Sequence, residues 1–109
     1  DLLADLTAHM VRTACGRTEL SGTYHAVAAG ETSWFGYANH VIRLARNAGQ
    51  AIKVAPDAVR PVASNAFATP ARRPRNSRLD THKLRNAFGL QLPEWQSGVD
   101  RMLTEVLGR

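Results

Sequence analysis

The residues best suited to chemistry in this 109-residue chain are basic and lie close together in one stretch. Six fall within fourteen positions: Arg72, Arg73, Arg75, Arg78, Lys83 and Arg85. A planar guanidinium group can donate two parallel hydrogen bonds to one phosphate group, which a lysine cannot do. Pro74 fixes the backbone between two of the arginines, and Asn76 and Ser77 add groups that can hydrogen-bond a ribose. These residue types favour a site for a diphosphate.

Two other interpretations of the basic stretch stay open. It can be a solvated basic face with one or two structural salt bridges, because the net charge is +5, from 14 Lys and Arg against 9 Asp and Glu. It can also belong to a small nucleic-acid-binding domain, which predicts steep salt dependence of binding. Near the basic run the aromatic residues are Phe67 and Phe88, and no stacking platform accompanies it. We therefore do not expect a nucleic-acid partner.

The motifs of a complete active site are missing from this sequence. It contains no glycine-rich dinucleotide fingerprint, no phosphate-cradling loop and no Gly-x-Ser-x-Gly elbow. A zinc site is not expected, because the histidines are widely spaced and lack cysteine partners: His9, His25, His40 and His82. The one cysteine, Cys15, favours a cytoplasmic protein and is expected to be a buried or merely tolerated thiol. We predict neither a catalytic nor a cofactor-binding residue here.

Periodicity and punctuation residues predict the elements that must position the basic stretch. Apolar residues at three- and four-residue steps predict one helix from residue 2 to just before Gly16. They predict another from Trp34 that runs to residues 47–49, capped by Thr32 or Ser33 and stopped by Gly49. Two further helices are expected, over residues 81–88 with Asp80 as cap, and from Pro93 onward. Short strands are predicted over residues 23–27 and 52–54, and an irregular connection over residues 55–77, a length that is usually functional.

This inventory of about four helices with two or three short strands indicates an α/β protein, or α+β for the chain by itself. The length suits one small domain, and the strands are too few to close a sheet. We expect them to extend a sheet, or to pack on a body, that lies outside this chain. Trp34 and Trp95 fall on apolar helical stripes, which favours core packing over sugar stacking. No apolar run is long enough to span a membrane, so a membrane partner is not expected.

Three motifs, in order, resemble the dTDP-4-dehydrorhamnose reductases, members of the extended short-chain dehydrogenase/reductase group. The first motif consists of residues 22–28 (GTYHAVA) and 32–38 (TSWFGYA), which are similar to the strand and helix that open the C-terminal half of that family. Residues 68–81 (ATPARRPRNSRLDT) and 92–99 (LPEWQSGV) match the same family. The resemblance runs from Leu2 to about Leu107 and identifies residues 1–109 as the C-terminal substrate-binding lobe of a Rossmann-type reductase. We expect the N-terminal NAD(P)-binding domain to lie outside this sequence.

The resemblance implies reduction of dTDP-4-dehydro-L-rhamnose to dTDP-L-rhamnose, for cell-surface polysaccharide, with NADPH or NADH held by the absent domain. In this group an Arg of an Arg-Pro-x-Asn stretch approaches the nucleotide diphosphate and the Asn faces the ribose. These roles fall on Arg73 and Asn76, with Arg72 beside them. The catalytic Tyr and Lys are expected upstream, since neither Tyr24 nor Tyr37 begins a Tyr-x-x-x-Lys motif. We therefore expect this chain to bind the dTDP-sugar together with its own Rossmann domain. The chain by itself is expected to be inactive.

The resemblance also leaves alternatives. Some bacterial members form homodimers with Mg²⁺ between acidic residues of helices like the first and last here. The matching positions are Asp1 and Glu105, for which ordinary exposed carboxylates are the other interpretation. The Arg-Pro-x-Asn pattern occurs too in related proteins that reduce no dTDP-sugar, among them a regulatory subunit of methionine adenosyltransferase. The pattern can thus be a fold-stabilising turn, and the alternative function is a non-catalytic regulatory or structural homologue.

Overall fold

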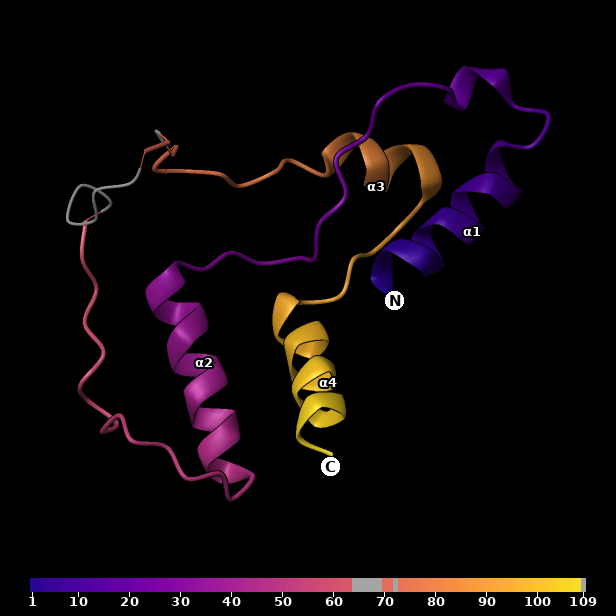
Figure 1. Ribbon diagram of the computed structural model, residues 1–109. Helices are drawn as coiled ribbons and strands as arrows, with labels where there is room; N and C mark the ends of the chain where they lie inside the picture. Colours follow the sequence, from indigo (N-terminus) through magenta and orange to yellow (C-terminus); the bar gives the residue numbers. More distant parts are fainter. Residues whose placement is uncertain (64–69, 72, 109) are drawn as a thin grey trace. The chain divides into compact units, whose positions relative to one another are not determined.

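A computed structural model describes residues 1–63, 70–71 and 73–108. The helices are α1 (Leu2–Ala14), the 3-10 helix η1 (Thr18–Leu20), α2 (Trp34–Asn47), α3 (His82–Phe88) and α4 (Trp95–Leu107) (Figure 1). The chain forms two compact units. The first contains residues 1–30 and 79–98, and the second contains residues 31–78 and 99–109. Helix α4 therefore gives its first turn to the first unit and its remaining turns to the second.

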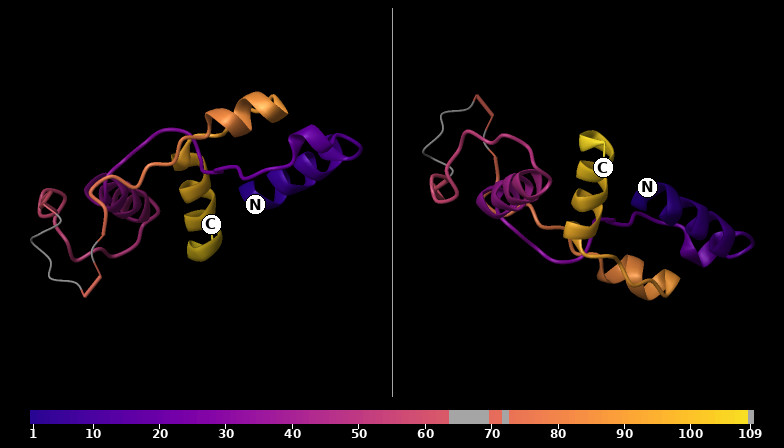
Figure 2. Two further views of the ribbon diagram at one scale, coloured as in Figure 1. Left: turned by 90° about the horizontal axis from the view of Figure 1, so that it is seen from above. Right: turned by 90° about the horizontal axis from the view of Figure 1, so that it is seen from below.

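The core of the first unit is made of leucines and one phenylalanine. Its buried members are Leu6, Leu20, Leu84, Phe88 and Leu92, drawn from α1, η1, α3 and the segment after α3. Helices α1 and α3 lie side by side in all views (Figure 2). The apolar stripe of α1 therefore finds its partner in α3, as an amphipathic helix requires.

The two predicted strands are not present. Within the described residues no strand forms, and the one β-contact in the first unit is an isolated parallel bridge between Ala29 and Glu94. Ala29 N donates to Pro93 O at 2.8 Å, and Trp95 N donates to Ala29 O at 3.0 Å. Strand propensity extends a backbone, but a strand also needs a neighbour that accepts and donates its hydrogen bonds. The regular secondary structure of the described residues is helical, so the α/β class is not seen in them.

Residues 23–27 are held in place by side chains instead of a strand ladder. Lys83 Nζ donates to the carbonyl oxygen of Thr23 at 2.9 Å and lies 4.6 Å from the ring centroid of Tyr24. The Tyr24 hydroxyl donates to Leu20 O at 2.6 Å, and its ring meets Phe88 edge to face at 5.3 Å. These contacts attach the extended segment to the core of the first unit.

The second unit is built on α2 and the later turns of α4. Ser33 is the N-cap of α2, because its Oγ accepts from Gly36 N at 3.1 Å. Gly49, with φ of +88°, follows the helix end as predicted. His40 Nε2 on α2 lies 2.6 Å from Asp100 Oδ1 on α4. This contact ties the two helices together within the unit.

Some of the other structural predictions from the sequence are confirmed and others are wrong. Helix α1 ends before Gly16 as expected, and the described part of residues 55–77 is irregular as expected. Helix α4 begins at Trp95 instead of Pro93, since the Pro93 carbonyl accepts the hydrogen bond from Ala29. Cys15 is exposed, so of the two expectations for this thiol, burial is wrong. Among the described residues, no helix combines the length and the apolar character needed to cross a membrane.

The prediction that Trp34 packs in the core is wrong, since its side chain is 86% exposed. Periodicity placed it on the apolar stripe of α2. However, Trp34 is the first residue of the helix, and its surroundings leave it exposed. Trp95 is partly buried, which agrees with packing. An exposed tryptophan at the start of α2 is a feature that the sequence did not predict.

Candidate substrate-binding site

The arginine segment, residues 73–78, is exposed and irregular and is organised by one asparagine. Asn76 Oδ1 accepts hydrogen bonds from both the backbone N and the Nε of Arg78, each at 3.0 Å. An arginine can only donate, so these two bonds fix which end of the amide faces Arg78. The Asn76 NH₂ group makes no hydrogen bond to a residue that the structure describes. Asn76 therefore forms a local turn and still has two donors to offer.

Arg78 attaches the segment to the residues that precede α2. Its Nη1 donates to Glu31 Oε2, and both side chains are well exposed. Exposed ion pairs of this kind contribute about 0 to 1 kcal/mol to stability. The pair is thus better understood as a positional link than as a stabilising one. It brings Asn76 and Glu31 together although they lie 45 positions apart in the sequence.

Two arginines of the segment remain open to an anion. Arg73 and Arg75 are exposed, and neither has a hydrogen bond or ion pair with any residue that the structure describes. Pro74 lies between them. Arg72, the third predicted contact, lies outside the described residues. The alternative of a solvated basic face with one or two structural salt bridges also fits these residues, with Arg78 and Glu31 as the salt bridge.

The last two basic residues of the stretch have structural partners in the first unit. Lys83 binds the carbonyl of Thr23, as described above, and Arg85 Nε donates to Thr81 Oγ1 at 3.1 Å. Helix α3 begins one residue later than predicted, with Thr81 as the N-cap residue in place of Asp80. Asp80 Oδ1 still accepts a hydrogen bond from His82 N at 2.9 Å at the start of the helix. The basic residues of this run that the structure describes therefore divide into cations that hold the fold and cations that face solvent.

The predicted metal ligands receive no support as a site. Asp1 is the N-cap residue of α1 in the first unit, and Glu105 belongs to the second. Glu105 Oε1 accepts from Arg101 Nε at 3.4 Å, one helical turn away. No group of three or more His, Cys, Asp or Glu side chains suited to a metal ion occurs in the described part of the chain. The structure thus gives no reason to assign Mg²⁺ to these residues.

The lowered pKa of Glu19 belongs to a pair outside the arginine segment. Glu19 has a pKa below its ordinary value because Arg17 Nε donates to its carboxylate at 2.9 Å. Its own backbone amide lowers the pKa further. This exposed pair lies in η1 and the turn before it, in the first unit, whereas residues 73–78 belong to the second. The case for the arginine segment therefore rests on open donors and geometry.

A groove in the second unit is too small and too apolar to hold a sugar nucleotide. It has a volume of about 170 Å³ and is lined by Leu44, Ala48, Asp100, Leu103, Thr104 and Leu107. Pockets for small molecules usually measure about 300 to 1,000 Å³. The groove also contains none of the arginines. A sugar nucleotide at the arginine segment would therefore need further contacts from outside this chain.

Comparison with known proteins now adds the decisive observation. The family model described as "RmlD substrate binding domain" matches residues 1–107. The chain belongs to this family. The resemblance seen in the three motifs is thereby confirmed, and so is the interpretation of these residues as a substrate-binding domain.

Curated relatives of this RmlD domain agree. The chain is 49% identical over 106 residues to the dTDP-4-dehydrorhamnose reductase of Escherichia coli (strain K12), covering 97% of the chain and 35% of that relative. It is 35% identical over 111 residues to the reductase of Burkholderia thailandensis, covering 98% and 37%. For the reductase of Streptomyces griseus the identity is 34% over 107 residues, covering 98% and 33%. The chain thus spans about a third of the length of these relatives.

Some residues of the candidate site could be predicted from the sequence, and others could not. Arg73 and Asn76 were found through the Arg-Pro-x-Asn pattern, and the structure places both on the exposed segment. Glu31 was missed because its partner Arg78 is 47 positions away and no local pattern joins them. The exposure of Trp34 was missed because the helical stripe on which it falls predicts burial.

Proposed function

We propose that this chain is the sugar-nucleotide-binding portion of a cytoplasmic dTDP-4-dehydrorhamnose reductase. The full-length protein would reduce dTDP-4-dehydro-L-rhamnose to dTDP-L-rhamnose with NADPH or NADH. The observation that carries this proposal is the family match over residues 1–107, with relatives that are named as reductases. The open arginines of the segment supply a chemical reason for a diphosphate ligand.

Within this function, Arg73 binds the diphosphate and Asn76 binds the ribose, with Arg72 as a further contact to the phosphates. Arg73 suits its role because it is exposed and keeps its five donors available. Asn76 suits its role because the turn with Arg78 uses only its oxygen and leaves the NH₂ group for a ribose hydroxyl. The turn therefore serves both the fold and the ligand.

The chemical step belongs to a part of the protein outside this chain. These 109 residues contain no Tyr-x-x-x-Lys motif and no glycine-rich fingerprint. NADPH or NADH supplies the hydride when it is bound by the Rossmann domain, which is the expected partner of this chain. The residues here hold and orient the nucleotide end of the substrate. A homodimer, implied by the resemblance for some members, stays a prediction.

A substitution at Arg73 in the full-length protein tests this assignment. Arg73→Ala should raise the KM for dTDP-4-dehydro-L-rhamnose about tenfold or more, because a charge-assisted hydrogen bond contributes roughly 1.5 to 3 kcal/mol. The KM for NADPH should stay within about twofold. Steady-state kinetics with each substrate varied in turn gives both values.

Arg75→Ala is the matched control, since Arg75 is equally exposed and its loss removes the same charge. We expect it to raise the KM for the sugar nucleotide less than Arg73→Ala does. Equal effects of the two substitutions would reduce the role of Arg73 to general electrostatic attraction. An unchanged KM in Arg73→Ala would remove this residue from the site.

A further inference from the structure

Trp34 is the most exposed of the large apolar side chains in the described part of the chain, at 86%. Tryptophan is on average one of the more buried residue types, so a side chain this open needs a reason. Its ring is held edge to face against Tyr37, with ring centroids 5.9 Å apart and planes at 80°. Despite this contact, 86% of the residue is exposed, so most of the indole remains open to a planar partner.

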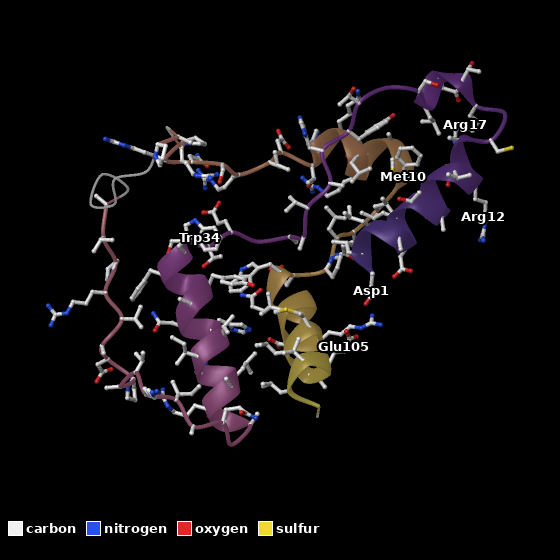
Figure 3. The ribbon with its side chains drawn as sticks, viewed as in Figure 1. Asp1, Met10, Arg12, Arg17, Trp34 and Glu105 are labelled. Carbon is white, nitrogen blue, oxygen red and sulfur yellow. The ribbon has the colours of Figure 1, made fainter. Side chains whose placement is uncertain are left out.

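The position of Trp34 relates it to the arginine segment within the second unit. Trp34 begins α2, and Glu31, three residues before it, binds Arg78. Arg78 in turn holds the oxygen of Asn76. Figure 3 shows the labelled Trp34 at the N-terminal end of α2, the end that follows Glu31 in the chain. A continuous series of contacts and short chain links therefore runs from the segment to the indole.

The order of these groups matches the order of groups in a nucleoside diphosphate. Along the series lie an open guanidinium at Arg73, an amide at Asn76 and an aromatic face at Trp34. Along the ligand lie the diphosphate, the ribose and the base. We propose that Trp34 is the stacking platform for the base of the nucleotide, an inference that rests on the proposed function. Aromatic side chains stack on every base, because each base has a flat π face.

The surroundings of Trp34 favour a ligand over a protein surface as its partner. The three residues that precede it, Glu31, Thr32 and Ser33, are all exposed and polar or charged. Interfaces between proteins are depleted of charged residues at their core. A single large aromatic ring beside polar groups and open arginines is instead typical of sites that combine stacking with phosphate binding. Base stacking thus accounts for the polar setting as well as for the exposed ring.

A pair of substitutions in the full-length protein separates stacking from simple apolar contact. Trp34→Phe keeps an aromatic face, whereas Trp34→Leu keeps an apolar side chain without one. Calorimetric titration with dTDP measures the affinity for the whole nucleotide, and titration with inorganic pyrophosphate measures the affinity for a diphosphate without a base. We expect Trp34→Leu to weaken dTDP binding about tenfold, Trp34→Phe to bind dTDP within about threefold of wild type, and both to keep wild-type pyrophosphate affinity.

Phe35→Leu is the control, because it removes an aromatic ring one position along the helix and should leave dTDP affinity unchanged. The inference is overturned if Trp34→Leu binds dTDP as tightly as wild type, or if dTDP and pyrophosphate affinity fall equally. It is also overturned if the Phe and Leu variants lose the same affinity. Wild-type protein that binds no dTDP would overturn the proposed function itself, and this outcome is distinct from the other three.

Discussion

Gly30 illustrates how one residue type can fix the path of the chain. Its φ is +84°, a conformation that side-chain-bearing residues rarely adopt, and it follows Ala29, which bridges to Glu94. A Cβ atom at this position would lie 2.6 Å from Glu94 Oε2 and 3.2 Å from Trp95 Cδ1. The Glu94 carboxylate ends a flexible, exposed side chain that can move aside, so the positive φ and the approach of Trp95 are what favour glycine. The contact with Glu94 and Trp95 could not be predicted from the sequence.

Replacing Gly30 by alanine should destabilise the protein by about 2 kcal/mol, because the strain of a positive φ is joined by a steric clash. Gly16→Ala is the control, since φ is +77° there but a Cβ would meet nothing within 4 Å. That substitution should cost only about 1 kcal/mol. Urea unfolding of the two variants beside the parent protein measures the difference. Equal costs would show that the contact with Glu94 and Trp95 is unimportant.

Residues that carry a local signal could be predicted from the sequence, and residues defined by distant contacts could not. Ser33 and Gly49 were found as the cap and stop of a helix because their roles depend on neighbours in sequence. The pairing of Arg78 with Glu31 depends on the path of the whole intervening chain. The exposure of Trp34 likewise depends on where packing begins along α2.

At the scale of elements, the helices could be predicted and the strands could not. A helix satisfies its backbone hydrogen bonds within its own residues, so a periodic pattern is nearly sufficient to identify it. A strand depends on a neighbouring strand. Residues 23–27 are held instead by Lys83, which contacts Thr23 and Tyr24, and by the hydrogen bond from the Tyr24 hydroxyl to Leu20 O. The same residues could still pair with a strand outside this chain, as the sequence predicts.

Helix α3 is short and depends on its buried leucine for stability. Leu84 has no exposed surface and lies in the core of the first unit. Leu84→Ala should lower the free energy of unfolding by about 2 to 5 kcal/mol, because it removes buried methyl groups and leaves a cavity. Leu79→Ala, at a side chain that is 47% exposed, makes the same chemical change and should cost less than about 1 kcal/mol. Chemical denaturation of both variants gives the comparison, and similar losses would contradict the assigned core.

At the scale of the whole molecule, the chain is about a third of the length of its curated relatives. Its described residues present the open guanidinium groups of Arg73 and Arg75, but the groove of the second unit is below the usual size for a small-molecule pocket. The family could be recognised from three motifs because they occur in the right order over almost the whole chain. Neither enclosure of the ligand nor the chemical step is assigned to the described residues, and we propose that both need residues outside this sequence.

The most direct test of the account is an assay of NADPH oxidation in the presence of dTDP-4-dehydro-L-rhamnose. It should be run with the full-length protein and, side by side, with residues 1–109 alone. We predict that the full-length protein oxidises NADPH only when the sugar nucleotide is present, and that residues 1–109 alone do not. Turnover by residues 1–109 alone, or folded full-length protein that leaves this sugar nucleotide unreduced, would contradict the account.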